Sequence, residues 1–159
     1  MAKAVKNNVL RYLERCGVEH TPYSYDTADG NIDAVSVARK IGRDPEEVFK
    51  TLVTRSAGPK YFVFIVPGCC ELDLKKAAKA AGEKSVEMIP SKELLPLTGY
   101  VHGGCSPIGM KKAFPTWIHE TAAEAGIIYV SAGRVGAQIE LKTEDLAKAA
   151  ACEFADLVI

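Results

Sequence analysis

Apolar positions near the start of the chain repeat at the spacing of an amphipathic helix. They lie three or four residues apart and end at a glycine, where a left-handed residue commonly closes a helix: Val5, Val9, Tyr12, Leu13, Cys16 and Gly17. The next run, from His20 to Tyr25, is rich in aromatic and β-prone residues and predicts a strand. Pro22 places this strand at a sheet edge, and Tyr23 and Tyr25 share one of its faces.

Capping residues and helix-ending glycines predict five further helices. Their starts and ends are Asp33 to about Ile41, a short helix opened by Asp44-Pro45-Glu46-Glu47, Asp73 to Gly82, Ser91 to Gly99, and Thr143 to about Ala150. In each case a side chain that can accept a backbone N–H precedes the first helical turn. Helices therefore alternate with strands along the chain.

Short β-prone runs separate these helices. The predicted strands are 49–54 and 61–67, joined by a hairpin loop at 56–59, then 85–88, 117–120, 127–131 and 137–141, the last two joined by the turn 132–136, and the tail 154–159. Short turns between neighbouring strands favour antiparallel pairing. We therefore expect one α+β domain over residues 1–159, with a mixed, largely antiparallel and barrel-like β-sheet surrounded by helices.

Composition supports one folded unit and narrows the range of partners. The 159 residues are 48% hydrophobic and 25% charged, which is ordinary for a globular protein and excludes two large domains. Lys and Arg (20) balance Asp and Glu (20), so the chain has no overall basic field for a nucleic acid. Any such contact must rest on a local patch of charge.

Cysteine usage and the N-terminal residues predict a reducing, cytoplasmic location. Five cysteines are scattered along the chain, and the adjacent pair Cys69 and Cys70 can bridge to itself only with local strain. No apolar run reaches 18 residues, and residues 1–8 lack the apolar core of a signal peptide. We expect no membrane association.

Lys50 is a charged residue inside the otherwise apolar strand 48–53. The two-residue period places it on the same face as Val48 and Leu52. A lysine on such a face is costly unless its ammonium group reaches a cavity or a partner. It is therefore a candidate for binding a carboxylate or phosphate, and the alternative is a lysine whose amine extends back to solvent.

The segment 99–109 contains four glycines and a proline and predicts a structured loop. The adjacent Gly103 and Gly104 allow backbone N–H groups to converge on an oxygen, although the alternative is simply a tight turn. The loop has the spacing of neither a Walker A nor a dinucleotide motif. Cys105 and His102 are only a weak candidate for a nucleophile and its general base, because closeness in sequence alone suggests them. No cysteine or histidine spacing predicts a metal site.

Several of these segments together resemble the YbaK-type Cys-tRNA(Pro) deacylases, which are free-standing relatives of the editing domain inserted in bacterial prolyl-tRNA synthetases. The matching motifs are Phe49-Lys50-Thr51-Leu52, 74–79, Gly99-Tyr100 with 103–109, 128–133 and Ala155-Asp156-Leu157. They occur in order over nearly the whole chain. The resemblance implies a mixed, barrel-like sheet wrapped by helices.

The resemblance also implies the site residues. Lys50 matches an essential pocket lysine, Gly103 and Ser131 match a pocket glycine and serine, and Tyr25 matches a pocket tyrosine, with Tyr23 as the alternative. The implied set is Lys50, Gly103 and Gly104 for catalysis, and Tyr25, Thr51, Ser106 and Ser131 for substrate binding. Thr51 is typical of cysteine-specific relatives, whereas Ala132 stands where many relatives have a second glycine.

The implied activity is removal of cysteine wrongly attached to proline tRNA, without a metal or cofactor. The substrate thiol would attack its own ester while the Gly103 and Gly104 N–H groups hold the oxyanion. The expected partners are the acceptor end of tRNA(Pro) and prolyl-tRNA synthetase. The alternatives are a deacylase for another small aminoacyl group, a non-catalytic tRNA- or synthetase-binding module, and a small-molecule-binding regulator.

Overall fold

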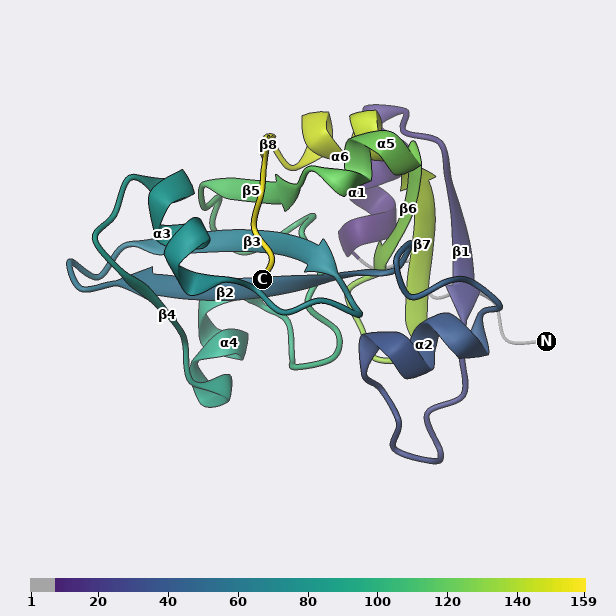
Figure 1. The fold of residues 1–159 in the computed structure, drawn as a ribbon. Coiled ribbons are helices and arrows are strands. Elements are labelled where there is room, and N and C mark those ends of the chain that lie inside the picture. Colours follow the sequence, from purple (N-terminus) through teal and green to yellow (C-terminus); the bar gives the residue numbers. More distant parts are fainter. Residues whose placement is uncertain (1–7) are drawn as a thin grey trace.

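The computed structural model describes residues 8–159 and folds them into two β-sheets surrounded by helices (Figure 1). The elements are α1 (Asn8–Cys16), β1 (His20–Ser24), α2 (Ala34–Lys40), β2 (Phe49–Ser56), β3 (Tyr61–Pro67), α3 (Leu74–Ala81), β4 (Val86–Met88), α4 (Ser91–Thr98), β5 (Thr116–His119), α5 (Thr121–Ala125), β6 (Ile127–Ser131), β7 (Ala137–Lys142), α6 (Thr143–Ala149) and β8 (Cys152–Ala155). Val5, predicted in the first helix, lies outside the described residues.

The two sheets differ in size and in strand direction. The smaller has the order β1-β7-β6 and is antiparallel throughout, with β1 at an edge as Pro22 predicts. The larger has the order β4-β2-β3-β5-β8, in which β3-β5 and β5-β8 are parallel pairs. The prediction of a mixed and largely antiparallel α+β fold is therefore confirmed.

β3 lies at the centre of the larger sheet and is buried on both faces. Val63 and Ile65 join the main core with α1 and α4, whereas Phe62 and Phe64 pack against α3. Figure 1 accordingly shows α3 and α4 on opposite sides of this sheet. Burial on both faces explains why this strand reads as a continuous apolar run.

The sheets do not join into a closed barrel. Within residues 8–159 they meet through one isolated parallel bridge, between Val48 and Tyr129. The Tyr129 N–H also donates to the Glu47 carbonyl at 3.0 Å, so the start of β2 is fixed against β6. The barrel-like expectation holds only in the sense that the two curved sheets touch at this corner.

Four predicted helix boundaries are confirmed by capping geometry. The Asp33 carboxylate accepts the Ser36 N–H at 3.0 Å, and the Asp73 carboxylate accepts the Lys75 N–H at 2.9 Å. Gly82 and Gly99 end their helices in the left-handed conformation, with φ of 72° and 87°. The sequence therefore placed α2, α3 and the end of α4 through local chemistry.

Two helix predictions are corrected. Residues 44–47 form a turn, not a helix, because the Glu47 N–H bonds back to the Asp44 carbonyl at 2.9 Å and the chain enters β2 immediately afterwards. Thr143 does not cap α6: Lys142 is the N-cap, and the Thr143 hydroxyl donates instead to the Ala122 carbonyl at 2.7 Å.

Three smaller differences concern the other segments. Ser91 is the first residue of α4, and the capping position is Pro90, which gives no side-chain hydrogen bond. The short helix α5 follows β5 and was not predicted. The C-terminal strand is β8, two residues earlier than expected, and among residues 8–159 the tail beyond it pairs through the isolated Leu72–Val158 bridge.

The Asp73 cap generates a testable prediction. Asp73→Ala removes the carboxylate that accepts the Lys75 and Lys76 N–H groups at 2.9 and 3.2 Å. The free energy of unfolding should fall by about 1 kcal/mol, the usual cost of losing an N-cap. Asp73→Asn keeps an acceptor oxygen and is the matched control. Chemical denaturation of the three proteins measures the effect, and equal loss in both variants would contradict a capping role.

Candidate functional site

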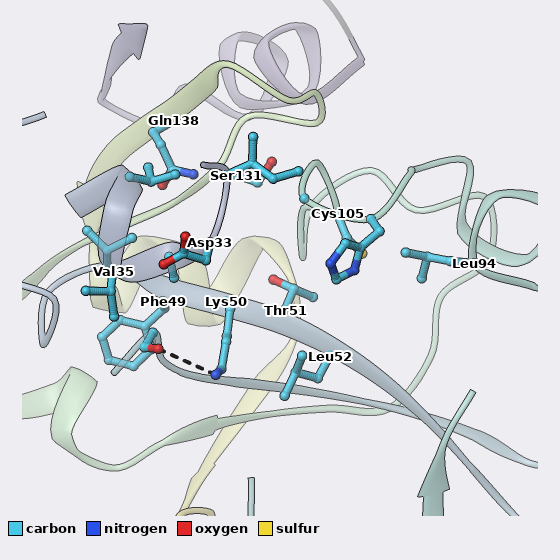
Figure 2. Close-up of a pocket in the computed structure, with 17 residues that line it drawn as sticks. Asp33, Val35, Phe49, Lys50, Thr51, Leu52, Leu94, Cys105, Ser131 and Gln138 are labelled. Carbon is cyan, nitrogen blue, oxygen red and sulfur yellow. Dashed lines mark hydrogen bonds between the residues drawn. The ribbon is translucent and has the colours of Figure 1, made fainter. Parts of the chain in front are cut away.

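A cavity of about 350 Å³ opens where β2, α2, the glycine-rich loop and the β6-β7 hairpin meet (Figure 2). Its lining residues are Ile32, Asp33, Ala34, Val35, Val37, Val48, Phe49, Lys50, Thr51, Leu52, Gly68, Leu94, His102, Gly103, Cys105, Ser131 and Gln138. Four of the predicted site residues are among them: Lys50, Thr51, Gly103 and Ser131. A volume of this size suits a small ligand group.

Lys50 lies at the start of β2 and is half-buried. Its ammonium donates to the Gly68 carbonyl at 3.5 Å, a contact drawn as the dashed line in Figure 2. The amine therefore has one weak protein partner and retains donors for a ligand. The sequence prediction that this lysine reaches a cavity agrees with this geometry, and its essential role stays a prediction.

Lys50 and Thr51 leave β2 on opposite sides, as successive residues of a strand must. Figure 2 shows Lys50 and Leu52 on one side of the strand and Thr51 on the other, toward the part of the cavity that holds Ser131 and Cys105. The cavity thus extends around the strand. The Lys50 ammonium and the hydroxyl groups of Thr51 and Ser131 can therefore contact different parts of a ligand.

Two buried side-chain oxygens in the cavity have no hydrogen-bond partner among the described residues, and they are Thr51 Oγ1 and Gln138 Oε1. Gln138 lies on the central strand β7 directly opposite Ser131 and is only 6% exposed. The Ser131 hydroxyl accepts the Gly133 N–H at 3.1 Å, which leaves its own hydrogen available to donate. Unpaired buried polar atoms are costly, so they indicate where a polar ligand is complementary.

The glycine-rich loop requires glycine at two adjacent positions for different reasons. Gly103 has a φ of 85°, and a Cβ there would lie 2.7 Å from Ile32 Cδ1. A Cβ on Gly104 would lie 2.9 Å from the backbone of Arg134 and Val135, in the turn between β6 and β7. The loop and this turn are therefore in direct backbone contact.

The two glycine N–H groups are not equivalent. The Gly104 N–H already donates to the Val101 carbonyl at 2.9 Å, and Gly104 does not line the cavity. No partner within residues 8–159 accepts the Gly103 N–H, and Gly103 does line the cavity. Of the predicted diglycine pair, only Gly103 combines a position in the cavity wall with an N–H that has no acceptor within residues 8–159.

Buried hydrogen bonds fix the loop to α4. The Tyr100 hydroxyl donates to the Ile108 carbonyl, and the Tyr100 N–H donates to Thr98 Oγ1 at 3.1 Å. Burial raises the pKa of Tyr100 to about 12, so its hydroxyl remains a donor at neutral pH. Ser106, predicted to bind substrate, is fully buried outside the cavity, where its hydroxyl accepts the Ile108 N–H at 3.3 Å. In this geometry Ser106 supports the loop.

Neither predicted tyrosine lines the cavity. Tyr23 is held in a surface cluster, where its hydroxyl donates to Glu140 at 3.1 Å and accepts from Arg43 at 3.3 Å. Tyr25 is 9% exposed, and its buried hydroxyl has no partner among the described residues. Of the two, Tyr25 alone keeps an unpaired hydroxyl. Its role in substrate binding stays a prediction.

Cys105 is unsuited to act as a nucleophile. Burial raises the pKa of its thiol to about 12, so the thiol stays protonated at neutral pH. His102 is exposed at the cavity rim, and no hydrogen bond joins it to Cys105 in the described part of the chain. Within residues 8–159, no cluster of three His, Cys, Asp or Glu side chains could hold a metal ion.

Asp33 adds a negative charge at the cavity, a feature that the sequence indicated only as a helix cap. Hydrogen bonds from the Ser36 hydroxyl and then from the Ser36 N–H lower the pKa of its carboxyl. Ile32 is positioned by the preceding loop, because Lys40 donates to Asp29 at 2.7 Å and to the Asn31 carbonyl at 2.9 Å. Neither residue was predicted to line a site.

Gln138 is the residue that sequence reasoning missed most clearly. It alternates with apolar neighbours, a pattern typical of a strand face exposed to water. The signal that identifies it is the predicted hairpin itself, because the five-residue turn 132–136 places Gln138 opposite Ser131. A polar residue facing a candidate site serine is then a second candidate.

Comparisons with known proteins identify the family. The model of the aminoacyl-tRNA editing domain matches residues 31–149. A protein of Enterococcus faecalis (strain ATCC 700802 / V583) named "Putative Cys-tRNA(Pro)/Cys-tRNA(Cys) deacylase EbsC" is 45% identical over 154 residues, covering 96% of this chain and 93% of that protein. The resemblance to editing deacylases inferred from sequence is thereby confirmed.

Two solved structures share the fold. One, described as "a putative trans-editing enzyme for prolyl tRNA synthetase", has a TM-score of 0.85 at 22% identity and covers 100% of this chain and 99% of its own. The other, described as "hypothetical protein APE2540", has a TM-score of 0.87 at 20% identity and covers 96% of this chain and 100% of its own. No helix in the described part of this chain is both long and apolar enough to cross a bilayer. With the family model covering most of its length, the chain belongs to the aminoacyl-tRNA editing domain family.

Proposed function

We propose that this protein is an aminoacyl-tRNA deacylase that removes cysteine from tRNA(Pro). The observation that carries the proposal is the cavity itself, which combines a cation at Lys50 with unpaired polar atoms on Thr51, Gln138 and Gly103. Such a site matches an aminoacyl ester, which has an ammonium group, a carbonyl and an adjacent phosphate. The Enterococcus faecalis relative named for this activity supports the same substrate.

The two sides of β2 divide the substrate between them. The Lys50 ammonium, on the side of Gly68, binds the terminal adenosine or its phosphate as a point charge. The cysteinyl group lies on the Thr51 side, where Ser131 and Gln138 face each other across the hairpin. The Gln138 carbonyl accepts the α-ammonium group, and the Asp33 carboxylate contributes a favourable field for that cation.

The Gly103 N–H stabilises the negative charge that develops on the ester oxygen. A donor fixed before the reaction costs no reorganisation at the transition state, and loss of one such donor typically slows a reaction by about 10²–10³. The contact of the glycine loop with the Arg134 and Val135 backbone supplies that rigidity. Thr51 Oγ1 lies buried within the same cavity and pairs with the small polar side chain of cysteine.

The attacking group is the thiol of the substrate, because Cys105 stays protonated and no hydrogen bond within residues 8–159 joins it to His102. The cysteine sulfur forms a bond to its own ester carbonyl carbon, and the bond from that carbon to the ribose oxygen breaks. The ribose oxygen takes up the proton that the thiol loses. The cyclic thiolactone released in this step then reacts with water to give free cysteine. The enzyme contributes orientation and charge stabilisation.

The acceptor end of tRNA(Pro) is the expected nucleic-acid partner. Balanced charge, 20 basic against 20 acidic residues, predicts weak tRNA affinity for the isolated protein at moderate salt. Delivery by prolyl-tRNA synthetase supplies the missing affinity. The structural neighbour described as a trans-editing enzyme for that synthetase supports this partner.

Replacing Lys50 tests the function directly. Lys50→Ala should lower the rate of Cys-tRNA(Pro) deacylation by about 10² or more, as expected when a key electrostatic donor is lost. A time course on Cys-, Ala- and Pro-charged tRNA(Pro) measures this, with the exposed Lys84→Ala as the matched control. A variant that loses tRNA binding while the wild type shows no turnover would favour a non-catalytic binding module.

Replacing Gln138 tests the ammonium contact. Gln138→Ala should reduce kcat/KM for Cys-tRNA(Pro) by roughly 10-fold or more, because a hydrogen bond to a charged group contributes about 1.5–3 kcal/mol. Gln138→Glu keeps an acceptor at the same position and should preserve most of the activity. Unchanged kcat/KM in the alanine variant, at unchanged thermal stability, would show that this carbonyl does not contact the substrate.

The nucleophile is tested with a modified substrate. tRNA(Pro) charged with S-methylcysteine has no thiol hydrogen and a much weaker sulfur nucleophile, so the wild-type protein should leave it intact over the time in which it clears Cys-tRNA(Pro). Competition binding of the two charged tRNAs shows whether the analogue still enters the cavity. Efficient cleavage of the analogue would rule out self-attack and point to an activated water.

A further inference from the structure

Two adjacent cysteines lie in the turn that supports the Lys50 side of the cavity. The Cys69 and Cys70 sulfurs are 3.9 Å apart, and both thiols are free. Cys69 is exposed and Cys70 is half-buried. The mechanism above uses neither of them. Two neighbouring thiols can undergo thiol–disulfide exchange: one forms a mixed disulfide, and the other attacks it to give an intramolecular disulfide.

The same turn holds the Lys50 amine. Gly68 lies immediately before the pair, and its carbonyl accepts the Lys50 ammonium at 3.5 Å while its N–H donates to the Val48 carbonyl at 2.7 Å. The Cys70 N–H closes the turn on the Pro67 carbonyl at 3.0 Å. The pair is therefore linked through one residue to both Val48 and Lys50 of the cavity.

Charged groups of the site also lie near the sulfur of Cys70. Burial, more than the neighbouring Cys69, raises the pKa of the Cys70 thiol, while the Lys50 charge opposes this increase and Glu46 adds to it. Cys69 is the more accessible of the two thiols and is suited to react first. Cys70 is suited to resolve the product, because its sulfur already contacts that of Cys69.

The turn has little room to change shape without moving the cavity wall. A Cβ placed on Gly68 would lie 2.3 Å from the Ala34 Cβ of α2, so Gly68 packs directly against that helix. An S–S bond is about 2.05 Å long, so the two sulfurs must approach by almost 2 Å from their present separation of 3.9 Å. A ring closed by adjacent cysteines is strained, and strained or exposed disulfides are the readily reversible ones.

We propose that Cys69 and Cys70 form a thiol modification site that takes a low-molecular-weight disulfide and switches off the cavity by displacing Gly68 and, through it, Lys50. Cys69 attacks one sulfur of the disulfide, forms a mixed disulfide and releases the first small thiol, which takes up the proton that Cys69 loses. The Cys70 sulfur then attacks Cys69, and the second small thiol leaves with the proton of Cys70. Two protein thiols are oxidised and one small disulfide is reduced.

The effect on activity rests on the proposed deacylase function, so the test also uses readouts that do not depend on it. The reduced protein is treated with glutathione disulfide and analysed by intact mass and peptide mapping. The wild type should lose two hydrogens and yield a peptide in which Cys69 and Cys70 are joined. Cys70→Ser should stop at a glutathione adduct on Cys69, and Cys69→Ser should form no such bridge. Cys16 is an exposed free cysteine in α1, so Cys16→Ser is the control and should form the same bridge as the wild type.

The second readout is the environment of Lys50. The rate at which acetic anhydride acetylates Lys50, followed by mass spectrometry, should change at least several-fold on oxidation of the wild type but not of Cys69→Ser. Deacylation of Cys-tRNA(Pro) should fall about 10-fold or more on oxidation and return with dithiothreitol. Absence of the bridge, or a bridge that leaves the acetylation rate unchanged, would overturn the proposal. If the reduced protein shows no deacylation, the function fails while these two chemical readouts still decide the thiol site.

Discussion

Val48 is held by its backbone from two directions, and the arrangement of the cavity depends on this constraint. Its bridge to Tyr129 joins the two sheets, and its carbonyl accepts the Gly68 N–H at 2.7 Å. The residue is also almost fully buried, at 1% exposure. Because side chains alternate along a strand, fixing Val48 also fixes the directions of Lys50 and Thr51. One backbone position thereby sets where a cation and a hydroxyl stand relative to each other.

The walls of the cavity come from segments that are distant in sequence but rigid for local reasons. The glycine loop is fixed by Tyr100 and Thr98, and it contacts the β6-β7 turn at Gly104 through backbone atoms. Lys40 holds the loop that positions Ile32. Each wall is thus stabilised by hydrogen bonds outside the cavity, which leaves the polar atoms inside it available for a ligand. This separation of supporting groups from binding groups is what a preorganised site requires.

The sequence predicted the elements whose signals are local. Asp33 and Asp73 cap their helices as their side chains indicated, and the apolar run of β3 reflects burial on both faces. The prediction from sequence failed where a tertiary contact overrode the local signal. Thr143 has the chemistry of a cap, but its hydroxyl is drawn to the Ala122 carbonyl of α5, a helix too short to be recognised from its own residues.

Some of the residues that line the cavity were identifiable from the sequence, and others were not, for similar reasons. Lys50 was identifiable because a charge interrupts an apolar strand, whereas Gln138 resembled a residue on a solvent-exposed face. The diglycine motif marked a loop that lines the cavity but not the difference between its two N–H groups. That difference depends on one hydrogen bond to the Val101 carbonyl, which no spacing rule predicts.

The unpaired hydroxyl of Thr51 has a consequence for the correctly charged tRNA. The side chain of a prolyl ester consists only of ring methylenes, so seating it in the cavity would leave that buried oxygen without a partner. Sites built around a buried polar group reject analogues that lack the matching group far more strongly than apolar pockets reject a change in size. Under the proposed function, Pro-tRNA(Pro) escapes hydrolysis because its binding would leave Thr51 Oγ1 unpaired, which is unfavourable in free energy. Steric exclusion of proline is then not required.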